Sequence, residues 1–205
     1  MLHNGVEWHE MQEDFAAWPS QKKEALHRLQ LSEDPFHFLF IGNGYLRKGL
    51  RQLLLGLSLL PHRDFHLSVI GKDRRLPEYV SLAKRLGLAK QVRFFGAQAD
   101  IRPFYQFADV LVIPSFYDPF ANVTIEALAM GLFTLSSRYN GGHEIITPQN
   151  GLVIEDLLDP DAMAQALSAA LHKQKTIASA KASRDSVKHL DFSKQLDRLT
   201  RMCLE

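Results

Sequence analysis

The sequence predicts an α/β fold, a doubly wound parallel sheet, and three observations support that prediction. Short apolar runs alternate with helical patterns from residue 36 to residue 172. Hydrophobic residues make up 46% of the 205 residues, which is enough apolar material for one sizeable core. No repeat of fixed period and no low-complexity tract interrupts the alternation. Consecutive parallel strands need right-handed crossovers, which place helices on both faces of the sheet.

The predicted strands are six apolar runs of three to six residues. They cover Phe36–Ile41, Phe65–Ile70, Val92–Phe95, Val110–Ile113, Phe133–Leu135 and Leu152–Ile154. Ligands of such sheets bind at the carboxyl ends of the strands. The loops that follow the first four strands are therefore the places to look for a site.

Helical patterns precede, separate and follow the predicted strands. They cover Ser20–Leu31, Leu50–Leu60, Pro77–Leu86, Ile101–Phe107, Val123–Met130 and Asp161–His172, with two further helical segments up to Leu204. Ser20 is expected to cap the first helix. The stretch before it is polar, is punctuated by Trp8, Trp18 and Pro19, and shows no clear strand.

Composition excludes several classes of protein. The formal net charge of +1 argues against bulk nucleic-acid binding, which needs a strongly basic surface. The single cysteine, Cys203, excludes an internal disulfide and two-cysteine metal motifs, and fits the cytoplasm. The first fourteen residues are acidic and lack a long apolar run, so no signal peptide is expected. No stretch approaches the roughly 18 apolar residues of a membrane span.

The loop after the first strand, residues 42–49, is the first candidate ligand site. Gly42 and Gly44, on either side of Asn43, allow close approach of the backbone to a ligand. Arg47 and Lys48 add two cations before a predicted helix amino terminus, whose free N–H groups favour anions. A diphosphate needs such a cradle. The alternative is a tight turn with solvated basic side chains, and neither the P-loop spacing nor the dinucleotide fingerprint is present.

The loop after the fourth strand, residues 114–131, carries the strongest signal. Asp118 lies in the turn before a helix, and Glu126 lies about one turn inside that helix. Asn122 is expected to cap the helix. The N–H groups near its start, those of Ala121, Asn122 and Val123, can receive phosphate or hydroxyl oxygens, and the two acids can accept hydrogen bonds from sugar hydroxyls. The alternative is a capped core helix whose acids favour its positive end.

These motifs resemble the E-x7-E region of retaining glycosyltransferases with two Rossmann-like domains, the GT-B architecture, and family 4 in particular. Asp118 stands in place of the first Glu, and Glu126 matches the second. The loop of residues 42–49 resembles the donor-phosphate loop of that family. The resemblance covers roughly residues 36–171 and is greatest to the lipopolysaccharide core glucosyltransferases. It implies the carboxyl-terminal, donor-binding half of such an enzyme.

The resemblance also implies a role for each candidate residue. Arg47 and Lys48 would neutralise the diphosphate leaving group of a UDP-sugar, which makes a metal unnecessary. Asp118 would bind hydroxyls of the donor sugar with a side chain one methylene shorter than Glu. Glu126 would bind the ribose hydroxyls. The remaining donor contacts would come from the backbone at Gly42, Asn43, Gly44, Phe120, Ala121, Asn122 and Val123.

No metal site and no cofactor other than the donor substrate is expected. The nine histidines are scattered without a metal-ligand spacing. Asp159-Pro160-Asp161 resembles a metal motif, but proline near a helix start indicates a cap. His143 follows two glycines, where a helix-start turn explains it as well as a ligand does. Lys72, Arg74 and Arg75 after the second strand indicate a solvated basic loop, with contact to the base or ribose as the alternative.

The resemblance divides the chain into three parts. Residues 1–34 would be a linker and helical lead-in from an amino-terminal Rossmann-like domain, and residues 2–6 resemble the family's linker into the donor domain. Residues 35–173 would be the nucleotide-sugar-binding Rossmann-like domain, and residues 174–205 the carboxyl-terminal helices. The missing domain would supply the site for a glycan or lipid-linked sugar acceptor, at the cytoplasmic face of the membrane. Two alternatives stay open: half of a sugar-nucleotide 2-epimerase, and a non-catalytic binding domain of the same fold.

Overall fold

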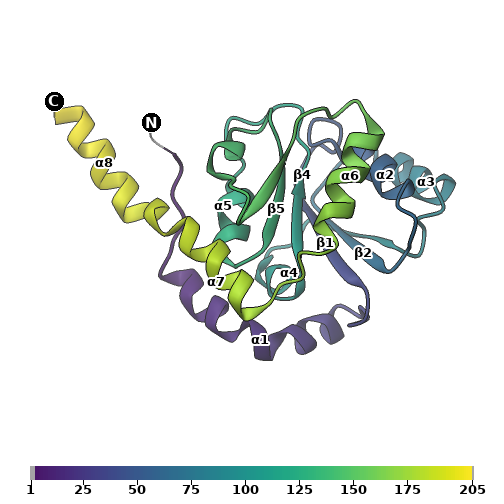
Figure 1. Ribbon diagram of the computed structural model, residues 1–205, viewed down its shortest axis with the longest axis horizontal. Coiled ribbons are helices and arrows are strands. Elements are labelled where there is room, and N and C mark those ends of the chain that lie inside the picture. The colour runs from purple at the N-terminus through teal and green to yellow at the C-terminus, as the bar shows by residue number, and fades with distance from the viewer. Residues whose placement is uncertain (1–2, 205) are drawn as a thin grey trace.

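A computed structural model describes residues 3–204, so Leu2 of the predicted linker lies outside the described residues. The chain forms one six-stranded parallel sheet in the order β3-β2-β1-β4-β5-β6 (Figure 1). The strands are β1 Phe36–Ile41, β2 Phe65–Ile70, β3 Val92–Gly96, β4 Val110–Ile113, β5 Phe133–Ser137 and β6 Gly151–Ile154. The predicted fold class and all six predicted strands are confirmed, and β3, β5 and β6 are one or two residues longer than predicted.

The sheet order changes direction between β1 and β4. From β1 the chain proceeds to β2 and β3 on one side, then returns to pair β4 with the other edge of β1. The loops after β1 and β4 therefore leave the sheet side by side and diverge. In open α/β sheets this is where the ligand crevice forms.

Helices cover both faces of the sheet (Figure 1). The α-helices are α1 Glu10–Arg28, α2 Leu50–Ser58, α3 Leu76–Arg85, α4 Arg102–Phe107, α5 Asn122–Ala129, α6 Pro160–Ala170, α7 Ile177–Ser186 and α8 Phe192–Leu204, and the 3-10 helices are η1 Gly141–Ile145 and η2 Lys188–Leu190. The predicted cap before α6 is confirmed, because the Asp159 side chain accepts a hydrogen bond from the N–H of Asp161 at 2.9 Å.

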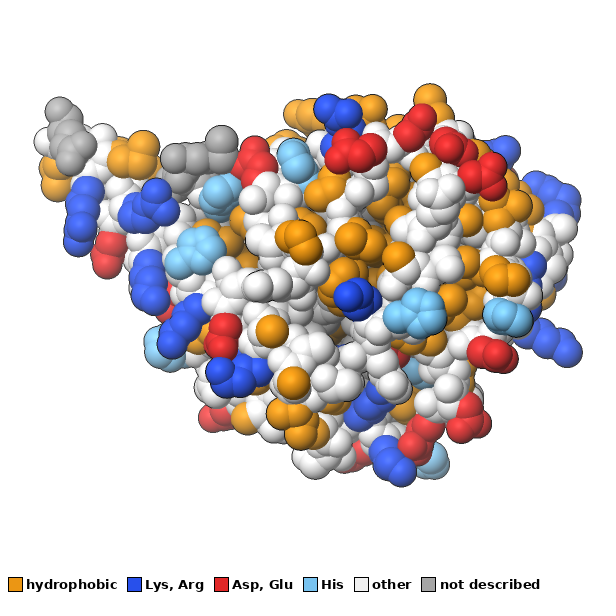
Figure 2. Space-filling model, in the orientation of Figure 1, with side chains coloured by type: hydrophobic (Ala, Val, Ile, Leu, Met, Phe, Trp, Pro, Cys, Tyr) orange, Lys and Arg blue, Asp and Glu red, His pale blue; other side chains and the backbone are white. Residues whose placement is uncertain are grey.

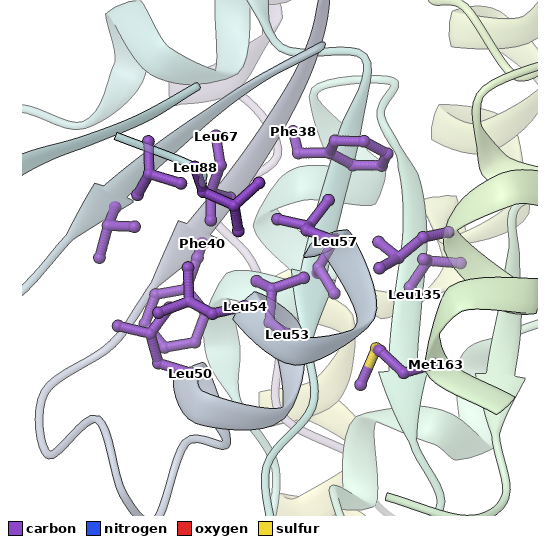
Figure 3. Close-up of a cluster of buried hydrophobic side chains, with 14 of the residues drawn as sticks. Phe38, Phe40, Leu50, Leu53, Leu54, Leu57, Leu67, Leu88, Leu135 and Met163 are labelled. Atoms are coloured by element: carbon purple, nitrogen blue, oxygen red, sulfur yellow. The ribbon is translucent and has the colours of Figure 1, made fainter. Parts of the chain in front are cut away.

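The strand pleat divides the apolar residues between two cores. In β1, Phe38 and Phe40 point to the face covered by α2, α3 and α6, and Leu39 and Ile41 point to the face covered by α1 and α4. Helix α2 meets the first face with leucines spaced three and four residues apart, at positions 50, 53, 54 and 57 (Figure 3). Every one of these leucines is fully buried, so this face anchors the loop that precedes α2.

The first helix differs from the prediction. It begins at Glu10, ten residues before Ser20, and Pro19 lies inside it. Ser20 is no cap, because its hydroxyl donates to the carbonyl of Ala17 at 2.9 Å. Packing explains the extra turns: Trp18 is buried, and Phe15 lies 4.6 Å from the Arg184 guanidinium. Such tertiary contacts outweigh the hydrogen bond that a proline cannot make.

Helix α8 projects away from the rest of the domain (Figure 1). Its apolar side chains recur with helical spacing and stay 43–61% exposed at Phe192, Leu196, Leu199 and Met202. Basic side chains lie along the same projection in the space-filling view, at the upper left of Figure 2. Within residues 3–204, no helix has the length and hydropathy that crossing a bilayer requires.

Candidate functional site

The candidate site lies at the carboxyl edge of the sheet, where the loops after β1, β4 and β5 meet. One glycine, Gly49, brings the first two of these loops together, and another, Gly42, makes room for a side chain within the first loop. A Cβ at Gly42 would lie 3.0 Å from the Lys48 side chain, so the missing side chain leaves room for the lysine stem. Gly49 has a positive φ of 73°, and a Cβ there would lie 1.8 Å from the carbonyl oxygen of Pro114. The loops therefore touch through their backbones.

Lys48, Arg47 and Asp118 meet at one carboxylate oxygen. The Nζ of Lys48 donates to Oδ2 of Asp118 at 2.5 Å, and a guanidinium nitrogen of Arg47 donates to the same oxygen at 3.1 Å. That nitrogen also donates to the carbonyl of Tyr117 at 2.7 Å. Lys48 and Asp118 are buried, and the Arg47 side chain is about half exposed. Two cations against one carboxylate give the cluster a surplus positive charge, which suits an anionic ligand.

The ionisation of Asp118 follows from the same contacts. Burial alone would raise the pKa of Asp118, because it disfavours the charged form. The hydrogen bonds and charges of Lys48 and Arg47 outweigh burial and hold that pKa below its ordinary value. Asp118 is thus a carboxylate at neutral pH. The arrangement brings together three residues that the sequence had placed in two separate loops.

The backbone of the first loop is held by the loop after β2. The Asn43 side chain accepts from the N–H of Lys72 at 2.7 Å, and Gly44 donates its N–H to the carbonyl of Lys72 at 3.1 Å. The predicted free N–H groups at the start of α2 are found in part. The N–H of Leu50 is taken by the carbonyl of Tyr45 at 3.0 Å, whereas within residues 3–204 those of Arg51 and Gln52 donate to no protein acceptor.

The open amides of the first loop lie earlier than the start of α2. Within residues 3–204, the N–H groups of Asn43, Leu46 and Arg47 donate to no protein acceptor. Asn43 and Gly44 are exposed at this edge, as a ligand-binding loop requires. The loop therefore offers donors to an anion from Asn43 and Arg47 rather than from the first residue of α2.

Helix α5 begins without a cap of its own, which corrects the prediction for Asn122. The N-cap residue is Ala121, and Asn122 is the first helical residue. The Asn122 side chain instead accepts a hydrogen bond from the Asn4 amide at 2.7 Å. The N–H of Ala121 donates to Oδ1 of Asn140 at 3.0 Å, in the loop after β5.

The two amides that follow Ala121 are open. In the part of the chain that the structure describes, the N–H groups of Asn122 and Val123 have no protein acceptor. They carry the positive end of the α5 dipole. Phe120, just before them, is partly buried, and its ring centroid lies 5.8 Å from that of His3. The predicted availability of N–H groups is therefore right for two of the three residues.

Glu126 lies in the second turn of α5 and is partly buried. Its Oε2 accepts a hydrogen bond from the hydroxyl of Tyr105 in α4 at 2.8 Å. Burial raises the pKa of Glu126, and the Tyr105 hydrogen bond opposes that rise. Tyr105 itself is fully buried, and both burial and Glu126 raise its pKa. The hydroxyl therefore stays protonated and orients the carboxylate.

Two of these contact residues, Asn140 and Tyr105, were not predicted. Asn140 donates a hydrogen bond to Thr124, 16 residues away in the sequence, and Tyr105 donates one to Glu126, 21 residues away. Local patterns carry no signal for such contacts, although an asparagine before two glycines at the carboxyl end of β5 was visible. His143 lies in η1, where its Nδ1 is 2.9 Å from the carbonyl of Asn140. His143 thus lies in the predicted turn, and its contact with a ligand stays a prediction.

No metal cluster is found in the described part of the chain. Residues 3–204 contain no group of three or more His, Cys, Asp or Glu side chains that could hold a metal ion. At the carboxyl edge, Arg47 and Lys48 place two cations against the single carboxylate of Asp118. The chemistry that this site can perform is therefore the binding and charge neutralisation of an anion by side-chain cations and backbone N–H groups.

A family profile described as glycosyl transferases group 1 matches residues 21–188. Among curated proteins, the lipopolysaccharide core biosynthesis glycosyltransferase LpsE of Rhizobium meliloti is 34% identical over 122 residues, which cover 59% of this chain and 35% of LpsE. The lipopolysaccharide glucosyltransferase WaaG of Escherichia coli is 29% identical over 137 residues, which cover 65% of this chain and 36% of WaaG. The matched regions thus span little more than a third of each relative.

Solved structures of the same fold extend over nearly the whole chain. The crystal structure of WaaG superposes with a TM-score of 0.81 and 23% identity, over 98% of this chain and 55% of that one. Anabaena HepE in complex with UDP-glucose gives a TM-score of 0.76 and 20% identity, over 98% of this chain and 56% of that one. The separately crystallised C-terminal domain of LpcC from Francisella tularensis gives a TM-score of 0.66 and 23% identity, over 81% of this chain and 90% of that one.

Proposed function

Because the chain belongs to the group 1 glycosyl transferases, we propose that it is the donor-binding half of a retaining, metal-independent glycosyltransferase. Its donor is a UDP-hexose, UDP-glucose in the first instance, and its acceptor is a glycan of the lipopolysaccharide core type. The observation that carries the proposal is the meeting of Lys48, Arg47 and Asp118 at the edge where the amides of Asn122 and Val123 are open.

The diphosphate, the sugar and the ribose of a nucleotide sugar each have a partner at this edge. Lys48, Arg47 and the open amides bind the diphosphate and stabilise the charge that develops on it as the glycosidic bond breaks. Asp118 has one oxygen engaged by the cations and binds a sugar hydroxyl with the other. Glu126, oriented by Tyr105, accepts hydrogen bonds from the ribose. Gly42, Asn43 and Gly44 let the ligand approach the backbone.

The comparisons support the choice of donor and acceptor by similarity. HepE has been crystallised with UDP, with UDP and glucose, and with UDP-glucose, and its fold matches this chain. LpsE, which is 34% identical over the matched region, is named for lipopolysaccharide core biosynthesis, and WaaG, which is 29% identical, is named a lipopolysaccharide glucosyltransferase. These relatives favour transfer of a sugar over the alternatives of epimerisation and non-catalytic binding.

A complete enzyme of this design also needs a second half. The chain spans about half the length of the solved enzymes that it matches, such as WaaG. The acceptor site then belongs to an amino-terminal Rossmann-like domain that faces the carboxyl edge of this sheet. The apolar stripe of α8, exposed at Leu196 and Leu199, is a surface against which that domain packs. The enzyme works in the cytoplasm, at the inner face of the membrane that carries its acceptor.

Calorimetry with the 205-residue chain tests the proposal. UDP, UDP-glucose, UDP-galactose and GDP-mannose are titrated separately, with and without a chelator. We expect UDP and UDP-glucose to bind with the same affinity in both conditions, because Lys48 and Arg47 supply the charge. Binding that requires a divalent metal contradicts metal independence, and preference for a guanosine nucleotide contradicts the proposed donor.

A further inference from the structure

We propose that Asn140 is a positioning residue for the donor: it holds the amino end of α5 in place from outside the helix, so that the helix keeps its first amides open for the ligand. The inference rests on the proposed function. It concerns a residue that the sequence motifs did not single out and that is fully buried, without contact to solvent.

Asn140 uses its whole side-chain amide. Oδ1 accepts from the N–H of Ala121 at 3.0 Å and of Gly142 at 3.1 Å. Nδ2 donates to the hydroxyl of Ser136 at 2.9 Å and of Thr124 at 3.2 Å. An amide offers two acceptor sites and two donors, and all are engaged. Aspartate cannot make these four hydrogen bonds, because a carboxylate accepts but does not donate. Leucine can neither accept nor donate.

Two glycines let the loop after β5 lie directly on the site. A Cβ at Gly141 would lie 1.8 Å from the carbonyl oxygen of Pro119, and one at Gly142 would lie 2.8 Å from the Thr124 hydroxyl. The N–H of Gly141 also donates to the carbonyl of Asp118 at 2.8 Å. The backbones that carry Asp118 and the start of α5 are therefore fixed to the same short segment.

The need for a cap outside the helix follows from where an ordinary cap would lie. A Ser, Thr, Asp or Asn at the N-cap accepts hydrogen bonds from the second or third helical N–H. In α5 the second is that of Val123, which is open, and the N-cap residue is Ala121, which has no acceptor in its side chain. Asn140 binds the amide of Ala121 itself, one residue before the helix. The helix end is thereby ordered without occupying the amides of Asn122 and Val123.

The main test compares two buried asparagines. Asn150 is as buried as Asn140, and its side chain makes three hydrogen bonds, to the Thr147 N–H, the Ile145 carbonyl and the Ser186 hydroxyl. Asn140→Ala and Asn150→Ala are compared by thermal unfolding and by UDP calorimetry at a temperature where both are folded. We expect both to lower the melting temperature, and only Asn140→Ala to weaken UDP binding, by at least about tenfold.

Two further variants keep the test informative if Asn140→Ala does not fold. Ala121→Ser places an ordinary cap on α5, so it should raise the melting temperature and weaken UDP binding at once. Asn140→Asp keeps the two amide contacts but adds buried negative charge beside the donor site, so it should lower UDP affinity by an amount that changes little with salt, because buried charges are screened weakly.

The outcomes separate this inference from the proposed function. If the wild-type chain binds no uridine nucleotide, the proposed function is wrong and this inference falls with it. If the wild-type chain binds UDP and folded Asn140→Ala or Ala121→Ser binds it equally well, Asn140 only supports the fold, and the inference alone is overturned.

Discussion

The ammonium group of Lys48 lies 2.5 Å from Oδ2 of Asp118, at a site where both residues are less than a tenth exposed. Removing two charges from water is unfavourable unless their geometry is good and their remaining groups are bonded. Here Arg47 adds a second donor to the same oxygen, and the surplus positive charge lies at the same edge of the sheet as the open amides of α5. The pair is therefore arranged for a third, anionic partner more than for stability alone.

Replacing Lys48 by methionine should separate binding from stability. Asp118 keeps only Arg47, so the free energy of unfolding should fall by about 1–3 kcal/mol, the usual effect of losing a hydrogen bond to a charged group. UDP affinity should fall by at least about tenfold, because a cation that faces the diphosphate is gone. Chemical denaturation and calorimetry measure the two effects.

A double variant distinguishes a ligand-binding lysine from a structural one. Lys48→Met with Asp118→Asn removes the uncompensated carboxylate, so stability should recover while UDP affinity stays low. Lys90→Met, at an exposed position on the opposite edge of the sheet, is the control and should change neither quantity. Full recovery of UDP affinity in the double variant would show that Lys48 serves only to neutralise Asp118.

Glu126→Gln should stabilise the folded protein and lower its affinity for UDP. Burial raises the pKa of Glu126 above its unfolded value, so the folded state binds more protons between the two values. The stability associated with this group is present at low pH and is lost as pH rises through the folded pKa. Glutamine, which stays neutral, should therefore melt at a higher temperature at neutral pH. Its UDP affinity should fall by at least about tenfold, because ribose loses a charged acceptor.

The pH dependence of binding gives an independent check on Glu126. Ribose hydroxyls prefer the carboxylate, so UDP affinity should fall as pH drops through the raised pKa of Glu126. Tyr105→Phe removes a hydrogen bond that lowers this pKa, so the fall should begin at a higher pH than in the wild type. If both variants, Glu126→Gln and Tyr105→Phe, keep the wild-type profile, another group is responsible for it.

One buried and one partly buried histidine, His37 and His66, should make the fold sensitive to mild acid. Burial lowers the pKa of His37 to about 4 and that of His66 to about 4, from an ordinary value of 6.5. Between pH 6.5 and about pH 4 the unfolded chain binds more protons than the folded one, so the free energy of unfolding falls as pH falls. The slope is at most about 1.4 kcal/mol per pH unit for each histidine. The full contribution of the two histidines to the free energy of unfolding is present above pH 6.5.

Comparison of variants isolates the histidine contribution, because Glu126 acts in the opposite direction. His66→Gln should lose stability less steeply than the wild type between pH 6.5 and 4, as measured by urea unfolding at several pH values. His62→Gln, at an exposed position, should keep the wild-type slope. Equal slopes in all three proteins would mean that His66 takes up no proton on unfolding.

The fold was predictable because its strongest signals are local. Each strand is an apolar run, and each helix that covers the sheet repeats its apolar residues every three or four positions, as at Leu50, Leu53 and Leu57. Because ligands bind where parallel strands end, the sequence also indicated that the loops carrying Lys48 and Asp118 were places to look for a site. Their shared hydrogen bond is the detail that the structure adds.

The features that were not predictable depend on distant partners. Helix α1 starts ten residues early because Arg184, in α7, stacks on Phe15 and Trp8. The cap of α5 comes from Asn140, 19 residues after Ala121. A local pattern assigned that cap to Asn122, the nearest suitable residue type, because propensity alone cannot show which side chain reaches a helix end from another loop.

The 205-residue chain should bind UDP-glucose without transferring its glucose. The donor groups Lys48, Arg47 and Asp118 lie on one edge of one sheet, and a transfer needs an acceptor hydroxyl held against the sugar from the other side. Orientation of that kind accounts for roughly 7–11 kcal/mol of a barrier. Water at an open edge also weakens the electrostatic help from the two cations. The measurement is a transfer assay with radiolabelled UDP-glucose and a panel of acceptors. It is run with this chain alone and again after the amino-terminal half is added. We expect product only in the second case, whereas efficient transfer by the chain alone would place the acceptor site within these residues and end the half-enzyme proposal.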